Sequence, residues 1–343
     1  MAIRGIMANF ARIQFAFAWA TALHRRQLPN LGLPSPYMEE KENVQTPRGL
    51  RAYLLAARPK TLTGALIPVI VGSALAYGDG CWDATAALLC ALFACGMQVA
   101  ANYINDLYDG LRGSDRPDRL GPKRACAEGW VTPRAMRQAI GASVAVSCAV
   151  GLGLLAHVRE RMPFGGWELV ALGALCVAFA YLYTTFFSCR GWGDVLVLVF
   201  FGFVPVGGTY YVQAATLTAD VAAGALACGL VVDTLLTLNN YRDREQDRQS
   251  GKLTLVLRLG GEAGRWLYLG LGVAGALVSL WFVVAGRVTL MELIWAPGVY
   301  LYLHAVTSIK LWRAKTAREY NKALGQTSRN MLFFALLLAA ALL

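Results

Sequence analysis

The feature that most constrains the fold is a series of apolar runs, each about 20 residues long, the length that a helix needs to cross a bilayer. The runs are residues 61–78, 84–105, 138–157, 167–187, 192–214, 219–240, 266–286, 290–309 and 325–343. Hydrophobic residues make up 57% of the chain and charged residues 15%, against about 45–50% and about 25% in soluble domains. The runs therefore predict an all-α integral membrane protein with nine transmembrane helices.

Lysine and arginine are unevenly distributed among the segments between the runs. With a cytoplasmic N-terminus, the outside loops hold only Arg159, Arg161 and Arg287. The inside segments hold 24 basic residues and are 48–60, 106–137, 188–191, 241–265 and 310–330. Because cytoplasmic loops carry an excess of Lys and Arg, this bias supports nine spans and places both Asp-rich stretches on the cytoplasmic side. We expect the spans to lie in the cytoplasmic membrane of a bacterium. The net charge of +11 follows from topology and requires no nucleic-acid partner.

Residues 1–47 differ from the rest of the chain. They contain no acidic residue before Glu39, and their apolar stretch is short for a membrane span. A signal or transit peptide is one interpretation, and an upstream extension with Met38 as the natural start is another. We expect an N-terminal extension, 1–47, that is poorly ordered, followed by a membrane domain, 48–343.

The eight cysteines form no C-x-x-C pair, and the three histidines are far apart in the sequence. This pattern does not favour a Cys/His metal site.

An N-x-x-x-D pattern occurs twice, each time at the end of an apolar run. It comprises Asn102 and Asp106, and again Asn239 and Asp243. Each copy closes the second span of a four-span group, and the first span of each group carries an internal proline. The pattern predicts two related four-helix halves plus a final helix, and such repeats tend to form a site at their interface.

Both copies are acidic clusters with helical spacing. Asn102, Asp106 and Asp109 would share one helix face, and the second cluster consists of Asn239, Asp243 and Asp247. Hard oxygen ligands suit Mg²⁺, which is bound by one or two carboxylates plus substrate phosphate. Two facing clusters could therefore hold two Mg²⁺ ions across one diphosphate. Solvated loop carboxylates, or carboxylates paired with nearby arginines, are the alternatives, and the repetition favours metal binding.

Four segments carry a resemblance to a known family. They are ARPKTLTGALIPVIVG (57–72), NDLYDGLRGSDRPDRLGPKRA (105–125), GWGDVLVLVFFGFVPVGGTYYVQ (191–213) and NNYRDREQDRQSGKLTLVLRLG (239–260). With these segments, the chain from about residue 48 onward resembles the UbiA superfamily of intramembrane prenyltransferases, and most closely its 1,4-dihydroxy-2-naphthoate branch. The resemblance implies a nine-helix fold with one acidic motif after the second helix and another after the sixth.

The resemblance also implies roles for individual residues. Asp106 and Asp109 would hold one Mg²⁺ and Asp243 and Asp247 the other, with Asn102 and Asn239 orienting ligands or touching the diphosphate. The remaining candidates are substrate contacts: Arg58, Lys60, Asp115, Arg119, Lys123, Lys252, Tyr183 and Asp194.

The implied reaction transfers a polyprenyl group from polyprenyl diphosphate to 1,4-dihydroxy-2-naphthoate. The ring loses its carboxylate as carbon dioxide and gives demethylmenaquinone. Tyrosine faces near the site, from Tyr181, Tyr183, Tyr210 or Tyr211, could shield an allylic cation, although tyrosines are also common at membrane interfaces. The intramembrane Asp233 is expected to line a cavity.

Two alternatives remain open. One is a prenyltransferase of the same fold that acts on another aromatic acceptor, such as 4-hydroxybenzoate. The other is a membrane transporter with a site at the repeat interface, which is less favoured because the outer loops offer almost no polar ligands.

Overall fold

The computed structural model describes residues 47–113 and 120–343, and over these ranges the chain is helical without β-strands. The prediction for the N-terminal extension falls outside the described residues, apart from Pro47.

Seven helical stretches of the described chain are long and apolar enough to cross a membrane. They are Leu50–Gly78, Ala84–Arg112, Pro133–Arg161, Trp167–Phe187, Gly193–Ala214, Ala219–Ser250 and Gly261–Val284. The last two predicted runs also become helices, α14 (Trp295–Arg313) and α15 (Ala317–Leu342). These two are not among the seven, and each carries polar and basic residues over part of its length.

The elements before the second motif are α2 (Leu50–Ala57), η1 (Pro59–Thr61), α3 (Leu62–Gly78), α4 (Ala84–Arg112), α5 (Pro133–Val158), η2 (Arg159–Arg161), α6 (Trp167–Leu182), η3 (Tyr183–Phe187), η4 (Ser188–Arg190), α7 (Gly193–Val197), η5 (Leu198–Phe203) and α8 (Val204–Ala214). The second motif lies in α9 (Ala219–Ser250), and α10 (Leu255–Leu259), α11 (Gly261–Ser279), α12 (Trp281–Val284) and α13 (Leu290–Leu293) precede α14 and α15.

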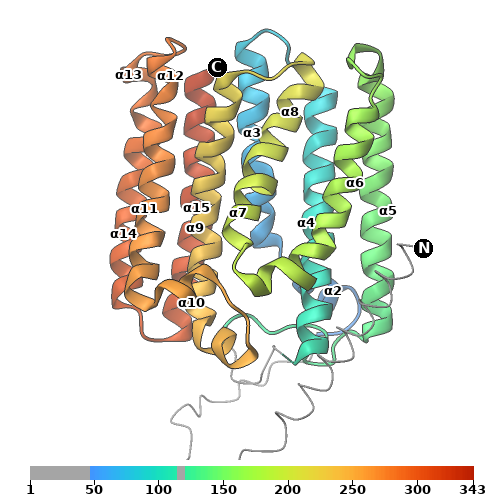
Figure 1. Ribbon diagram of the computed structural model, residues 1–343, viewed down its shortest axis with the longest axis vertical. Helices are drawn as coiled ribbons and strands as arrows, with labels where there is room; N and C mark the ends of the chain where they lie inside the picture. Colours follow the sequence, from blue (N-terminus) through green and yellow to red (C-terminus); the bar gives the residue numbers. More distant parts are fainter. Residues whose placement is uncertain (1–46, 114–119) are drawn as a thin grey trace, which may run out of the picture. The chain divides into compact units, whose positions relative to one another are not determined.

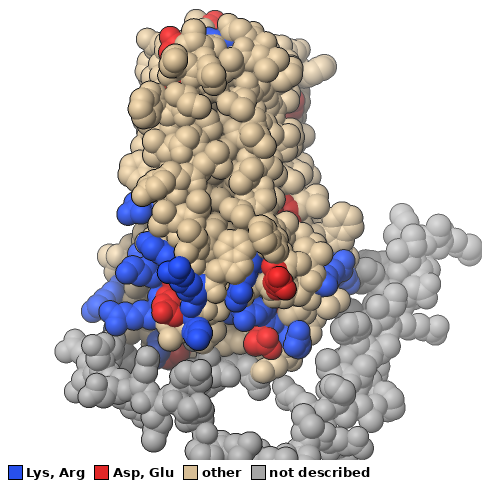
Figure 2. Space-filling model, turned by 90° about the vertical axis from the view of Figure 1, so that its left-hand side faces the viewer, with Lys and Arg blue, Asp and Glu red and all other residues tan. Residues whose placement is uncertain are grey.

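The long helices run side by side and alternate in direction, so that their connections fall at two ends (Figure 1). One end holds α2, α10 and the C-terminal ends of α4 and α9, and we call it the motif end. The opposite end holds the connections 79–83, 159–166, 215–218 and 285–289. On the face in Figure 2, the wall between the ends is almost free of charge, and Lys, Arg, Asp and Glu gather at the motif end.

The core lies where α3, α9 and α15 pack together with α8, α11 and α14. Small residues allow close helix approach, as in other membrane proteins. A Cβ atom on Gly202 would lie only 2.5 Å from the carbonyl oxygen of Ala225, so η5 and α9 can touch only through glycine. The apolar surfaces of α5 and α6 are mostly not buried inside the protein, as expected for helices that face lipid.

Both motif-bearing helices continue well beyond the apolar runs that predicted them. Gly113 caps the end of α4 and Gly251 caps the end of α9, and both glycines adopt left-handed φ angles, 67° and 73°. Left-handed glycine is a common helix terminator because it lacks a Cβ. The acidic residues therefore lie on regular helix, and the helical spacing assumed from the sequence applies.

Candidate functional site

The first motif begins with a hydrogen-bonded anchor at Asn102. The buried Asn102 amide donates to the Ala57 carbonyl at 2.7 Å and to Thr61 Oγ1 at 2.9 Å. Thr61 Oγ1 in turn donates to the Arg58 carbonyl at 2.9 Å. Arg58 has a φ of 51°, a conformation that costs a non-glycine residue about 1–3 kcal/mol. Asn102 thus helps to hold the predicted diphosphate-binding segment of Arg58 and Lys60 against α4.

Asp106 and Asp109 differ in their surroundings. The buried carboxylate of Asp106 accepts hydrogen bonds from the backbone N–H groups of Ala125 at 3.0 Å and Cys126 at 2.8 Å. Burial, together with the Asp106 charge, raises the pKa of the Cys126 thiol to about 12, so this thiol is neutral. Asp109 faces Arg124, with 3.6 Å between the guanidinium and carboxylate atoms. Asp106 therefore also organises the loop that follows its helix.

In the second motif, Asp243 forms two hydrogen bonds with the neighbouring Arg242, each 2.7 Å long. Arg242 is buried and also donates to Asn321 Oδ1 at 2.9 Å. Asp247 lies 3.6 Å from the Lys252 ammonium, just past the end of α9. Asn239 is half-buried on the same helix.

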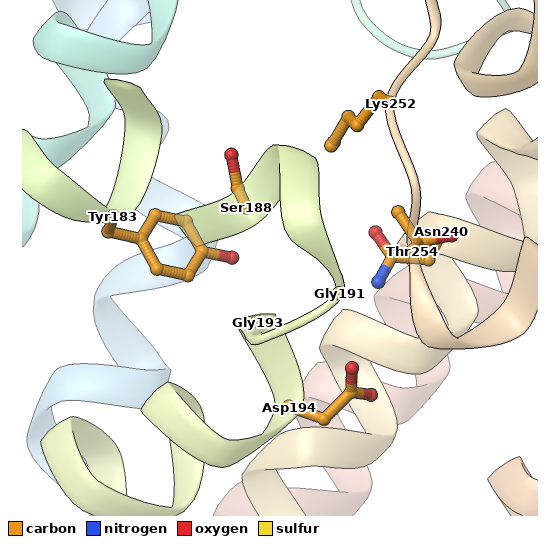
Figure 3. A pocket seen from close by; sticks show the side chains of 8 residues that line it. All are labelled: Tyr183, Ser188, Gly191, Gly193, Asp194, Asn240, Lys252 and Thr254. Carbon is orange, nitrogen blue, oxygen red and sulfur yellow. The ribbon is translucent and has the colours of Figure 1, made fainter. Parts of the chain in front are cut away.

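A pocket opens beside the second motif (Figure 3). Three of the predicted substrate contacts, Tyr183, Asp194 and Lys252, line it together. The other lining residues are Ser188, Gly191, Gly193, Asn240 and Thr254. The pocket wall comes from η3, η4 and α7 on one side and from α9 and the 251–254 connection on the other.

The pocket wall departs from regular α-helix. Tyr183–Phe187 and Leu198–Phe203 are π-helical turns on either side of α7. Such turns are rare and often occur at functional sites, because they re-aim side chains without breaking the helix. Arg258 Nη2 donates to the Arg190 carbonyl at 2.7 Å and ties α10 to the end of η4.

Charges from both motifs act on one side chain in this pocket. The Tyr183 hydroxyl lies within electrostatic range of the carboxylates of Asp194, Asp233, Asp109 and Asp247. Asp109 belongs to α4 and Asp247 to α9, so Tyr183 stands where the electrostatic influence of the two motifs overlaps. The Tyr183 hydroxyl points into the space between Ser188 and Gly193 (Figure 3).

The donor set of the motifs fits Mg²⁺ rather than a softer metal. It consists of carboxylate and amide oxygens, and the described residues contain no cluster of three or more His, Cys, Asp or Glu that could hold an ion. Two carboxylates per motif suffice for Mg²⁺, because this ion keeps several waters and takes further oxygens from a phosphate ligand. A carboxylate oxygen has more than one lone pair, so Asp106 can accept its backbone hydrogen bonds and still coordinate an ion.

Not all predicted contacts gather at the pocket. Lys123 has a side chain that is 70% exposed and pairs with Glu128 at 3.2 Å. Asp115 and Arg119 lie outside the described residues. Tyr210 and Tyr211 lie on α8 and bind Asp79 and Glu168 through their hydroxyls, so they do not join Tyr183.

The sequence reasoning missed Asn240, Ser188 and Thr254 as pocket residues. Asn240 follows the motif residue Asn239, and the double asparagine was a visible signal. Neighbouring residues on a helix point about 100° apart, so only one of the two can face the pocket directly. Nothing in the sequence alone distinguished Ser188 or Thr254 from ordinary loop residues.

The chain is similar to a known protein family and to individual members of it. The model of the UbiA prenyltransferase family matches residues 65–341. The 1,4-dihydroxy-2-naphthoate octaprenyltransferase of Escherichia coli is 40% identical over 234 residues, which cover 67% of this chain and 75% of the relative. The protein of the same name from Mycobacterium tuberculosis is 36% identical over 302 residues, which cover 84% of this chain and 96% of the relative.

Solved structures share the fold at low sequence identity. A UbiA homolog from Aeropyrum pernix, in its apo form, has a TM-score of 0.61 at 17% identity and covers 83% of this chain and 97% of its own. A UbiA homolog from Archaeoglobus fulgidus bound to GPP and Mg²⁺ has a TM-score of 0.58 at 17% identity, with 84% and 99% coverage. These likenesses establish the helical arrangement described above.

Proposed function

This chain belongs to the UbiA prenyltransferase family, and on that premise we propose that it transfers a polyprenyl group from polyprenyl diphosphate to 1,4-dihydroxy-2-naphthoate. The acceptor loses its carboxylate as carbon dioxide, and the product is the hydroquinone form of demethylmenaquinone, because the step involves no oxidant. The observation that carries the proposal is the similarity to naphthoate octaprenyltransferases over most of their length. The pocket that Tyr183, Asp194 and Lys252 line together also supports the proposal.

We also propose that the chain would hold the diphosphate together with two Mg²⁺ ions. Asp106 and Asp109 are the proposed ligands of one ion and Asp243 and Asp247 of the other, with Asn239 beside the second. Bound Mg²⁺ neutralises charge that develops on the leaving diphosphate. The position of Asn102, bonded to Ala57 and Thr61, supports an orienting role for its amide.

Basic residues of the chain bind the phosphate oxygens. Lys252 lines the pocket and lies next to Asp247, so its ammonium can exchange a carboxylate partner for a phosphate without crossing the site. Arg58 and Lys60 stand on the segment that Asn102 holds, and Lys123 lies farther out. Such charge-assisted hydrogen bonds are about twice as strong as neutral ones.

The residues around the reacting atoms keep water away and shield positive charge. The bond from the allylic carbon to the diphosphate oxygen breaks, and the developing cation lies near the aromatic face of Tyr183. The membrane accommodates the polyprenyl tail, and an apolar surround protects the cation from attack by water.

The layout we propose has nine spans, arranged as two four-helix repeats and a final helix. Helices α14 and α15 supply the eighth and ninth spans, and the alternating direction of the long helices supports this count (Figure 1). The motif end would face the cytoplasm of a bacterial inner membrane, because basic residues gather there (Figure 2).

The opposite end gives no support to the transporter alternative. Three of its aspartates are tied to basic side chains: Asp79 and Asp220 to Arg287, and Asp83 to His157 and Arg161. A transported solute would have to pass these ion pairs, whereas a transferase needs only the motif end and the lipid-facing sides.

The test is a transfer assay with the purified full-length chain in lipid nanodiscs. Polyprenyl diphosphate is supplied with either 1,4-dihydroxy-2-naphthoate or 4-hydroxybenzoate, with Mg²⁺ or with EDTA. We expect a prenylated, decarboxylated product from the naphthoate only when Mg²⁺ is present. Product from 4-hydroxybenzoate alone would overturn the acceptor, and product in EDTA would overturn the metal dependence.

A further inference from the structure

Helix α9 carries a buried polar stripe that leads from the pocket into the membrane-spanning part of the protein. Asp233, Thr237 and Asn240 follow one another at helical spacing and share one face. They are 1%, 0% and 7% exposed. The Asp233 Oδ1 and Thr237 Oγ1 atoms have no hydrogen-bond partner among the described residues.

A second buried carboxyl group lies across from this stripe. Asp194, on α7, is 7% exposed, and neither of its oxygens has a hydrogen-bond partner in the described chain. Helix α7 packs directly on α9, since a Cβ on Gly193 would lie 3.4 Å from the Leu236 side chain. The Asp194 charge acts on Asp233, and its carboxylate points from α7 towards α9 (Figure 3).

This arrangement is costly unless a ligand completes it. Buried polar atoms are nearly always hydrogen-bonded, so several unpartnered oxygens in one place call for an explanation. Two ionised carboxylates buried on packed helices would cost more still. Ionised carboxylate oxygens only accept hydrogen bonds. The complementary ligand must therefore bring O–H or N–H donors.

We propose that Asp194 and Asp233 form the subsite that binds the ring hydroxyl of the aromatic substrate and that Asp194 takes the hydroxyl proton during transfer. This inference rests on the proposed function, and it assigns Asp233, buried in the α9 span, as the positioning residue behind Asp194. Tyr183 and Lys252 line the same pocket as Asp194.

The step balances as follows. An electron pair of the ring forms the new bond to the allylic carbon while the carbon–oxygen bond to diphosphate breaks and its pair stays on the diphosphate. The ring oxygen becomes a carbonyl, and its proton passes to the Asp194 carboxylate. Carbon dioxide then leaves, its bonding pair returns to the ring, and Asp194 gives the proton back to the oxygen. The carboxylate is regenerated without any oxidant or reductant.

The test compares the naphthoate with its methyl ether at the hydroxyl beside the reacting carbon. Wild type, Asp194→Asn, Asp233→Asn and Glu262→Gln are assayed in nanodiscs, the last as a control because Glu262 is exposed and not among the pocket-lining residues. Binding of a prenyl thiolodiphosphate with Mg²⁺ is measured in parallel. We expect Asp194→Asn to lower kcat/KM for the hydroxyl substrate by about 100-fold. For Asp233→Asn we expect a loss of about 10-fold, from disturbed positioning rather than from loss of the proton acceptor.

Both Asp variants should discriminate less between hydroxyl and methyl ether than wild type does, while binding of the diphosphate stays unchanged. Variants that keep wild-type rates and discrimination would overturn the subsite, and so would a loss confined to diphosphate binding. If Asp194→Asn fails to fold, Asp233→Asn decides by the same criteria. A wild type that prenylates only another hydroxyarene would instead overturn the proposed acceptor, and the methyl-ether comparison with that acceptor would still test the subsite.

Discussion

At the opposite end, Arg287 donates to Asp79 and to Asp220, while Tyr210 donates to Asp79 at 2.6 Å and Trp281 to Asp220 at 2.8 Å. These groups come from distant parts of the chain, and each carboxylate oxygen has a donor. At the motif end, the Asp109 carboxylate lies 3.6 Å from the Arg124 guanidinium, and the Asp247 carboxylate lies 3.6 Å from the Lys252 ammonium.

This difference between the two ends distinguishes structural from functional carboxylates in one protein. A carboxylate held by short hydrogen bonds from several elements fixes those elements in place, and a new ligand would have to displace its donors. A carboxylate with longer contacts can accept an ion or a donor at lower cost. Asp106 and Asp243 stand between these cases. Asp106 fixes the 125–126 backbone and Asp243 accepts two short hydrogen bonds from Arg242, yet both belong to the motifs.

The largest effect should come from Asp243→Asn. The change removes a charge from the proposed Mg²⁺ set, and we expect transfer to fall by about 1,000-fold or more. The protein should still insert and fold, because Asn keeps one acceptor for Arg242, although Tm should fall since the buried Arg242 loses its charge partner. Turnover within tenfold of wild type would contradict the metal role. Asp106→Asn is a poorer test, since it also disturbs two backbone hydrogen bonds.

Substitutions of two lysines at the motif end should differ in their effect on KM for the prenyl diphosphate, and both effects should be smaller than that of Asp243→Asn. Lys252→Gln should raise KM for the prenyl diphosphate by about 10–100-fold, because it removes a charge-assisted hydrogen bond in the pocket. Lys123→Gln, at an exposed lysine that pairs with Glu128, should change KM by less than about threefold. Equal effects of the two substitutions would show that the pocket beside Lys252 is not where the diphosphate binds.

At the opposite end, a substitution should change stability and leave catalysis intact. Arg287→Gln leaves Asp79 and Asp220 without their cation, and we expect a loss of about 1–2 kcal/mol in the free energy of unfolding. That loss corresponds to a fall in Tm of about 2–6 °C. Transfer rates should stay within twofold of wild type. Arg159→Gln, at an exposed arginine of the same end, is the matched control, and a Tm loss equal to that of Arg287→Gln would contradict the pairing.

The smallest expected effect is a loss of thermal stability at low pH. The hydrogen bond from Arg287 holds the pKa of Asp79 below its ordinary value, although burial acts in the other direction. The stabilisation is fully present above the unfolded pKa of about 3.9 and is lost as the pH falls through the lower folded value. Tm of the wild type should therefore drop below about pH 4, and Asp79→Asn should drop less steeply over the same range. Parallel curves would contradict this linkage.

Much of the fold could be predicted because apolar length and charge bias are local signals. The run 84–105 became α4 and the run 219–240 became α9, and only their ends were misjudged. The apolar pattern stops at the lipid boundary, whereas the helices continue through Asp109 and Asp247 to their terminating glycines. An apolar run marks the part of a helix that lies in the membrane, and it does not mark where the helix ends.

The sequence predicted which types of ligand the site contains, but not which residues face the pocket. The repeat of Asn and Asp pointed to oxygen ligands, but choosing Asn239 over Asn240 required knowing which helix face the pocket occupies. The hydrogen bonds of Asp106 to residues 125 and 126, and the π-helical turns around α7, depend on contacts between segments far apart in the chain. No local pattern encodes such contacts.

The most direct test of the central claim is equilibrium binding of a prenyl thiolodiphosphate, with and without Mg²⁺, to wild type, Asp243→Asn and Arg287→Gln in nanodiscs. We predict tight, Mg²⁺-dependent binding by the wild type and by Arg287→Gln, and weakening by at least about 100-fold in Asp243→Asn. Binding that ignores Mg²⁺, or that Arg287→Gln weakens as much as Asp243→Asn does, would contradict the assignment of the two ends.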